Sequence, residues 1–104
     1  MNDPKPSKRI IDPEAGLRKL SLDQTCRGCG KRATDGHHIL LRSQRGDDVE
    51  DNIMPLCHIC HIAYHDGGRK DFKLTTAERG YLLAKLGSEA GNDYIARRYQ
   101  REEV

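Results

Sequence analysis

Four cysteines and five histidines lie within residues 26–65, at spacings that suit metal binding. The cysteines form two Cys-x-x-Cys pairs, and the histidines include an adjacent pair and a pair four residues apart. Thiolates bind zinc in matched sets, and imidazoles are its other common protein ligands. This stretch of the chain therefore predicts metal chemistry.

The two cysteine pairs predict a closed structural zinc site. Four thiolates make the full tetrahedral complement of zinc and leave no position for water. The candidate ligands are Cys26, Cys29, Cys57 and Cys60. The site would close the loop 30–56, which has 27 residues. A mixed site that combines the second cysteine pair with His61 and His65 is less favoured, because it leaves the first pair unused.

Disulfides are the alternative use of four cysteines, and the cellular compartment decides between the two. The N-terminal sequence MNDPKPSKRI has no apolar segment of the kind found in secretory signals, so we expect a cytoplasmic protein. Reducing conditions there favour zinc over disulfides.

The chain has few residues from which to build a hydrophobic core. Of its 104 residues 36% are hydrophobic, with one Phe and no Trp. A single domain of this composition needs further stabilisation, so we expect its folding to depend on bound metal. No apolar run reaches the length that spans a bilayer, which excludes a membrane protein.

Three segments are expected along the chain. Residues 1–21 are predicted to form a basic, partly flexible N-terminal arm with a helical turn over 14–20. Residues 22–68 are predicted to fold around the metal ligands, and residues 69–104 to form a helical segment.

Short apolar runs predict a hairpin in the middle segment. One strand is expected over 38–41 and another over 52–56, joined by the polar loop 43–50. A helix should then begin near Cys57 and end at the glycine pair 67–68. The order strand, strand, helix predicts a small α+β fold.

Two helices are expected in the C-terminal segment. Thr75 and Glu78 form a capping-box pattern, which predicts a helix that runs to Gly87. A last helix is expected over 93–102.

Charge is spread unevenly, although the net charge is only +2. Residues 1–21 carry five basic and three acidic side chains, and residues 69–104 carry eight and six. The middle segment carries five and seven, with Asp47 and Asp48 in its acidic loop. A phosphate backbone would therefore be held by the flanking segments rather than by this loop.

The histidine spacing predicts a second metal site. His61 and His65 lie one turn apart on one helix face and can bind a single ion. His37 or His38 can supply a third ligand, and the other is then free for proton transfer. Three protein ligands with open positions describe a catalytic metal site. His58 is expected to be a solvated side chain.

The order of these residues carries a family resemblance. The segments are Asp35-Gly36-His37-His38-Ile39, then Asn52, then Leu56-Cys57-x-x-Cys60-His61, then His65. They resemble the HNH endonucleases, which include small phage-encoded proteins and the nuclease domains of DNase colicins. The resemblance covers residues 26–66 and implies a ββα-metal finger, here with a four-cysteine zinc site and flanking C-terminal helices.

Carried over by position, the resemblance implies a role for each residue. His37, His61 and His65 match the metal ligands, His38 the general base and Asn52 the central asparagine. In the implied mechanism His38 takes a proton from water, hydroxide attacks the phosphorus, and the metal stabilises the extra charge. Asn52 is expected to tie the two strands together or to hold His38. Because adjacent strand residues point to opposite faces, His37 is expected just outside the regular strand.

The resemblance implies a metal-dependent DNA endonuclease that hydrolyses phosphodiester bonds by nicking or by double-strand cleavage. Its expected cofactors are the structural Zn²⁺ and one catalytic divalent ion, which is Zn²⁺, Mn²⁺, Ni²⁺ or Mg²⁺. Its partner is DNA, with Arg42 and Arg45 as candidates to hold phosphate. Family analogy alone adds a phage role in DNA processing or packaging, with phage packaging proteins as partners.

Two other functions fit parts of the pattern. The chain could be a non-catalytic zinc-stabilised module that binds nucleic acid, but such a module has no need of an unliganded imidazole such as that of His38. The two C-terminal helices could form a helix-turn-helix reader with its turn at Gly87 and Ser88, yet two helices packed on the finger explain the same residues.

Overall fold

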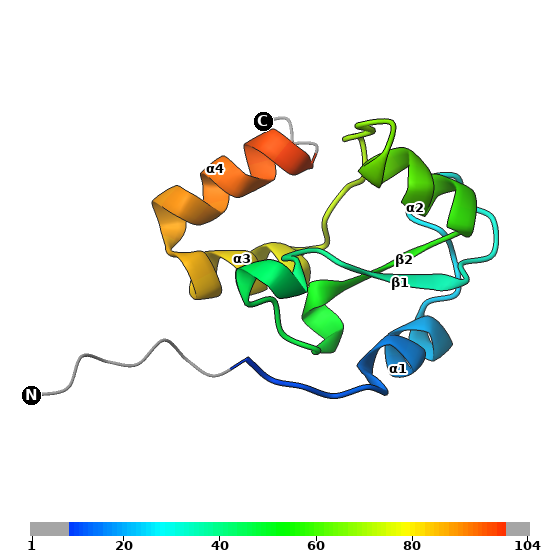
Figure 1. The fold of residues 1–104 in the computed structure, drawn as a ribbon, viewed down its shortest axis with the longest axis horizontal. Coiled ribbons are helices and arrows are strands. Elements are labelled where there is room, and N and C mark those ends of the chain that lie inside the picture. The colour runs from blue at the N-terminus through cyan, green and yellow to red at the C-terminus, as the bar shows by residue number, and fades with distance from the viewer. Residues whose placement is uncertain (1–8, 100–104) are drawn as a thin grey trace, which may run out of the picture.

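The computed structural model describes residues 9–99 and shows a small α+β fold with a two-stranded antiparallel sheet (Figure 1). The predicted order of strand, strand, helix is confirmed. In chain order the elements are α1 (Ala15–Leu22), β1 (Asp35–His38), the 3-10 helices η1 (Arg42–Gln44) and η2 (Glu50–Asn52), β2 (Ile53–Leu56), α2 (His58–His65), α3 (Thr76–Leu86) and α4 (Ser88–Arg98). None of the helices in the described part of the chain is long and apolar enough to cross a membrane.

The first strand of the hairpin begins and ends earlier than predicted. The register places Asp35 opposite Leu56, Gly36 opposite Pro55, His37 opposite Met54 and His38 opposite Ile53. The pairing of the two strands ends at His38, although the first strand was expected to continue to residue 41. Beyond His38, the side chain of Asn52 forms hydrogen bonds with the backbone of Leu40. Asn52 Oδ1 accepts from Leu40 N at 2.8 Å, and its Nδ2 donates to Leu40 O at 3.1 Å. A buried side chain thus replaces a strand partner.

Helix α2 follows β2 with a single residue between them. That residue, Cys57, is the N-cap, and its sulfur accepts a hydrogen bond from the backbone N–H of Cys60. The helix ends at His65, just before the glycine pair that was expected to stop it. Its predicted limits are confirmed.

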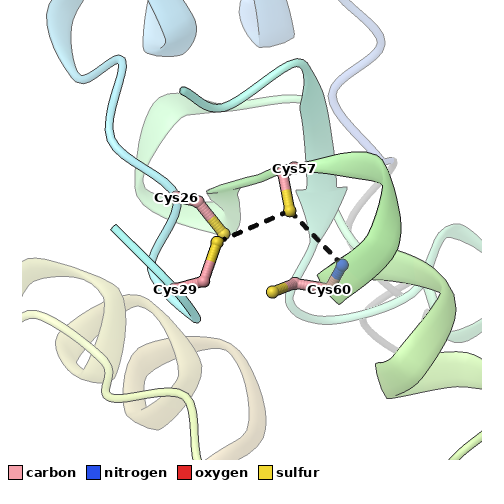
Figure 2. Close-up of side chains that lie close together, drawn as sticks. All are labelled: Cys26, Cys29, Cys57 and Cys60. Atoms are coloured by element: carbon pink, nitrogen blue, oxygen red, sulfur yellow. Dashed lines mark hydrogen bonds between the residues drawn. The ribbon is translucent and has the colours of Figure 1, made fainter. Parts of the chain in front are cut away.

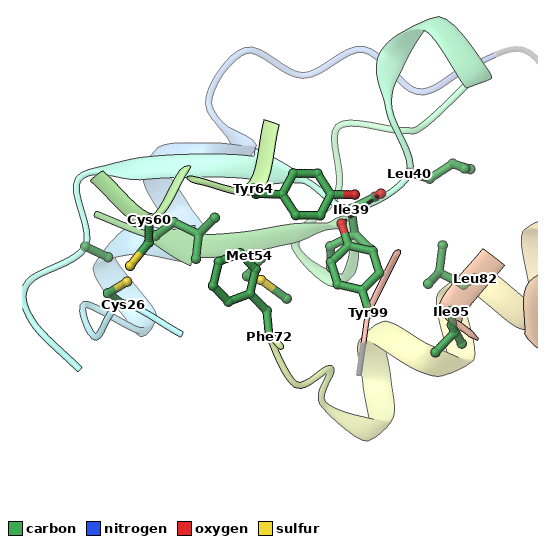
Figure 3. Close-up of a cluster of buried hydrophobic side chains, with 12 residues drawn as sticks. Cys26, Ile39, Leu40, Met54, Cys60, Tyr64, Phe72, Leu82, Ile95 and Tyr99 are labelled. Carbon is green, nitrogen blue, oxygen red and sulfur yellow. Dashed lines mark hydrogen bonds between the residues drawn. The ribbon is translucent and has the colours of Figure 1, made fainter. Parts of the chain in front are cut away.

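The hydrophobic core lies where the hairpin meets α2, α3 and α4 (Figure 3). The ring of Tyr64 in α2 stacks between those of Phe72 and Tyr99. Its centroid lies 6.1 Å from that of Phe72 and 5.5 Å from that of Tyr99. The only Phe of the chain is fully buried there. A composition poor in aromatic residues still builds a core because these few rings are placed in contact.

The C-terminal helices pack on this core. α3 begins with the predicted capping box of Thr75 and Glu78. α4 begins at Ser88 and ends at Arg98, so the limits predicted for it, 93 and 102, were wrong. Gly91 lies in the first turn of α4, and a glycine is not typical of a helix interior, so the sequence did not indicate this turn. A residue without a side chain is needed there, because a Cβ would lie 2.8 Å from Leu83 Cδ2 of α3. The end of the predicted helix, residues 100–102, lies outside the described residues.

The described part of the predicted flexible arm is held against the acidic loop. Arg9 donates to Gly46 O at 2.7 Å and to Asp48 Oδ1 at 2.8 Å. Ile10 N donates to Asp47 Oδ1 at 2.7 Å. Helix α1 then packs on both strands. Residues 9–22 are therefore part of the fold, whereas the start of the predicted arm, residues 1–8, lies outside the described residues.

A buried carboxylate joins three parts of the chain that are distant in sequence. Glu78 of α3 is fully buried, and Arg27 binds both of its oxygens, at 2.8 and 3.0 Å. Lys19 of α1 donates to Glu78 Oε2 at 3.0 Å. Burial raises the pKa of Glu78, but the Arg27 hydrogen bonds and the backbone N–H of Thr75 outweigh it and hold this pKa below its usual value. The capping residue seen in the sequence is also the centre of an ion-pair network.

We expect Glu78→Gln to lower the free energy of unfolding by about 3 kcal/mol at pH 7, because it removes the carboxylate that pairs with the partly buried Lys19 and leaves Arg27 only the more distant Asp23, at 3.8 Å. The matched control is Glu50→Gln, which removes a solvent-accessible carboxylate 3.4 Å from Arg18 Nε and should cost less than about 1 kcal/mol. Urea denaturation of the zinc-loaded protein measures both. Equal losses for the two variants would contradict the central role of Glu78.

Candidate metal centres and active site

The four cysteine sulfurs converge at the start of α2 (Figure 2). All four lie within 4.8 Å of one another, and the Sγ atoms of Cys29 and Cys57 are 3.7 Å apart. The sulfurs of a tetrahedral zinc site are about 3.8 Å apart, given a Zn–S bond of about 2.3 Å. All four cysteines are free thiols. The donor set and spacing fit a structural zinc ion, and the mixed Cys–His site is contradicted because the histidines form a separate cluster.

The turn between Cys26 and Cys29 is shaped for these sulfurs. Gly28 N donates to Cys26 Sγ at 3.3 Å, as Cys60 N does to Cys57 Sγ in the second pair at 3.5 Å. Gly30 has φ +79°, which an L side chain rarely adopts. Gly28 is needed for space instead, since a Cβ there would lie 2.9 Å from Cys60 Sγ.

Arg69 supplies a positive charge to the sulfur cluster. Its Nη1 donates to Cys60 Sγ at 3.1 Å, and its Nη2 donates to Gly28 O at 2.7 Å. Burial raises the pKa of the Cys60 thiol. For Cys26, burial acts in the same direction, but backbone N–H donors outweigh it and hold the pKa below its usual value. Arg69 thus offsets part of the negative charge that four thiolates would carry.

Three histidines form the second cluster. One ring nitrogen from each of His37, His61 and His65 lies within 4.8 Å of the others, so the three could hold one ion. Burial and the neighbouring His61 and His65 lower the pKa of His37 to about 3. Its imidazole is therefore neutral, which is the form that binds metal.

Asp35 orients His61. Its Oδ2 lies 3.0 Å from His61 Nδ1 and 3.1 Å from Nδ1 of the exposed His58. Burial raises the pKa of Asp35, but hydrogen bonds from His61, His58 and Thr34 hold it below its usual value. An ionised carboxylate can only accept, so His61 carries its proton on Nδ1 and keeps the Nε2 lone pair for a metal.

Tyr99 orients His37 in the same way. Its hydroxyl donates to Ile39 O at 3.2 Å and lies 2.8 Å from His37 Nε2. Because that hydroxyl has one proton, it accepts the Nε2–H of His37, and His37 Nδ1 keeps the free lone pair.

His38 belongs to a different arrangement. Its Nε2 lies 2.8 Å from Oδ1 of Asp48, which is buried. Burial raises the pKa of Asp48, but the N–H of Asp12, His38, Arg9 and Arg42 outweigh it and hold this pKa below its usual value. The carboxylate therefore accepts the Nε2 proton, and Nδ1 of His38 is left able to accept another.

His37 and His38 serve one cavity although both lie within β1. The prediction that His37 stands just outside the strand was wrong, since it pairs with Met54. Both histidines nevertheless line a cavity of about 380 Å³ at the end of the strand. Its other lining residues are Gly36, Leu41, Arg42, His61 and His65. Because β1 ends at His38, side chains from both of its faces can border the same space there.

The other predicted site residues lie at the edge of this cavity or away from it. Arg42 lines it, with its Nε 3.6 Å from Asp48 Oδ1, whereas Arg45 does not. Asn52 bonds to Leu40 and to Asp47 O at 2.9 Å rather than to His38. Its contacts are those of a residue that ties the hairpin and its loop together.

Sequence reasoning gave no role to three orienting residues. Asp35 stands in the quoted motif two positions before His37, which was a usable signal. Asp48 was counted only as part of the acidic loop, and Tyr99 was only one residue of the helix predicted over 93–102. The sequence pattern does not reveal this role for Asp48 and Tyr99, because their histidine partners are 10 and 62 residues away along the chain.

Removing the zinc should unfold the described domain, because the cysteine site joins the first turn to α2 in a chain with a small core. We expect a chelator to abolish the helical circular dichroism signal and Cys29→Ser to lower the unfolding midpoint. His65→Ala is the control: it should lose the second ion, keep the first and stay folded. A metal-free protein with the same unfolding midpoint as the metal-loaded protein would contradict this prediction.

Comparison with known protein families gives a match to part of the chain. The family model described as HNH endonuclease matches residues 26–67. This stretch contains both candidate metal clusters, His38 and Asn52. No curated protein matches the chain. The matched residues, which fold as strand, strand and helix around these candidate ligands, are similar to an HNH endonuclease domain.

Proposed function

We propose that this protein is a metal-dependent DNA endonuclease that hydrolyses phosphodiester bonds, by nicking or by cutting both strands. The observation that carries the proposal is that Asp48 lies 2.8 Å from Nε2 of His38, and that His38 lines the same cavity as the three candidate metal-binding histidines. Metal-dependent hydrolysis of a phosphodiester needs a general base with a fixed tautomer beside the ligands of a metal ion.

Each side chain has a defined task in this proposal. His38 accepts the proton of the attacking water on Nδ1 while Asp48 holds Nε2–H. Arg42, which is exposed at the cavity, attracts a phosphate of the substrate. A divalent ion held by His37, His61 and His65 would supply stabilisation of the charge that develops on the phosphate oxygens. Three imidazoles favour Zn²⁺, Mn²⁺ or Ni²⁺ over Mg²⁺ as that ion.

The alternative is a non-catalytic zinc-stabilised module that binds nucleic acid. Such a module would need cations for the phosphate backbone but not the buried Asp48 that fixes the ring of His38. The family match favours the enzyme, because the model describes endonucleases. Neither that model nor the described residues point to phage packaging proteins, so these partners form no part of the proposal.

We expect His38→Ala to lower cleavage of supercoiled plasmid by at least about 10²-fold, because it removes the group that accepts the proton. Wild type should convert the plasmid to nicked or linear form with at least one of Zn²⁺, Mn²⁺, Ni²⁺ and Mg²⁺. The assay is run beside metal analysis of the purified protein, where we expect two ions per chain.

The control for folding is the variant itself. His38→Ala should keep both ions, since His38 is not a member of either metal cluster, and should stay folded although it loses the hydrogen bond to the buried Asp48. Cleavage at the wild-type rate would refute the role of His38. Wild type that binds duplex DNA but cleaves it with none of the four metals would favour the binding module.

A further inference from the structure

A second cavity, of about 340 Å³, lies where the C-terminal ends of α2 and α4 come together (Figure 1). Its lining residues are Tyr64, His65, Lys70, Arg97 and Arg98. Three of these five are Lys or Arg and none is acidic, so we name it the basic pocket. No predicted function was attached to it.

The basic pocket adjoins the candidate active site. His65, one of the three clustered histidines, lines both cavities. The cations of the basic pocket therefore stand on one side of His65, while Arg42 and His38 stand in the other cavity. A strand that lay across His65 would therefore border both cavities.

The three cations differ in how they are held. Arg98 lies over the ring of Tyr94, with its guanidinium carbon 5.1 Å from the ring centroid. Arg97 pairs with the exposed Asp93 at 3.0 Å, a contact that is weak in water. Within residues 9–99, Lys70 has no hydrogen-bond or ion-pair partner, which leaves its ammonium group available to a ligand.

Resting on the proposed function, we infer that the basic pocket binds a backbone phosphate of the nucleic acid strand, next to the phosphate that is cleaved. Lys70 and Arg97 each neutralise phosphate charge, and Arg98 is placed by its contact with Tyr94. The pocket would act on any sequence, because phosphate contacts position a strand without reading its bases.

The test measures salt-dependent binding of a short fluorescent duplex. His38→Ala serves as the parent so that the duplex stays intact, and Lys70→Ala, Arg97→Ala or both are added to it. The slope of the logarithm of the association constant against the logarithm of the salt concentration is negative, and each phosphate contact that is lost should make it shallower by about 0.9. The same loss corresponds to about eightfold weaker binding at about 0.1 M salt. Lys73→Ala is the matched control, an exposed lysine three positions away that does not line the pocket.

The outcomes separate this inference from the proposed function. Lower slopes for Lys70→Ala and Arg97→Ala, with the parent slope kept in Lys73→Ala, support it. Slopes equal to that of the control overturn it and leave the proposed nuclease unaffected. Wild type that never cleaves, with the lower slopes still seen, overturns the nuclease alone. A parent that does not bind the duplex overturns both.

Discussion

The rest of the structure depends on the convergence of four cysteine sulfurs at the junction of β2 and α2. Cys57 follows the last residue of β2 and caps α2, so fixing its sulfur fixes the end of the strand and the start of the helix together. Cys26 and Cys29 bring in the first turn, and Arg27 between them reaches the buried Glu78 of α3. Metal at this point would therefore connect the hairpin to helices on both sides of it.

The candidate site is assembled from elements that are each too short to be stable alone. β1 supplies His37 and His38, and α2 supplies His61 and His65. The groups that orient them come from other places: Tyr99 follows α4, Asp48 lies in the loop, and Arg9 on the N-terminal segment binds the same carboxylate. Functional geometry and folding stability are thus carried by the same hydrogen bonds, as expected where side chains must be held in one rotamer and tautomer.

Acidic residues illustrate how tertiary contacts change the meaning of composition. Asp47 and Asp48 looked like a negative loop that phosphate would avoid. Both carboxylates are buried and form ion pairs within the protein, Asp47 with Lys85 at 2.8 Å and Asp48 with Arg9 at 2.8 Å. Exposed cations gather instead at the ends of α2 and α4, so the surface offered to an anion is more basic than the net charge suggests.

Local chemistry and short spacings determined what the sequence alone could predict. Cys-x-x-Cys pairs, two histidines one helical turn apart and a capping box act over a few residues, so the α2 and α3 helices and the candidate ligands Cys26, Cys29, Cys57, Cys60, His61 and His65 followed from them, whereas His37 followed only from the family resemblance. Tertiary structure decided the extent of β1, the start of α4 and the partners of His37, His38 and Glu78. Those features depend on side chains such as Asn52, Tyr99 and Asp48 reaching distant backbone or rings, and such contacts leave no periodic trace in the sequence.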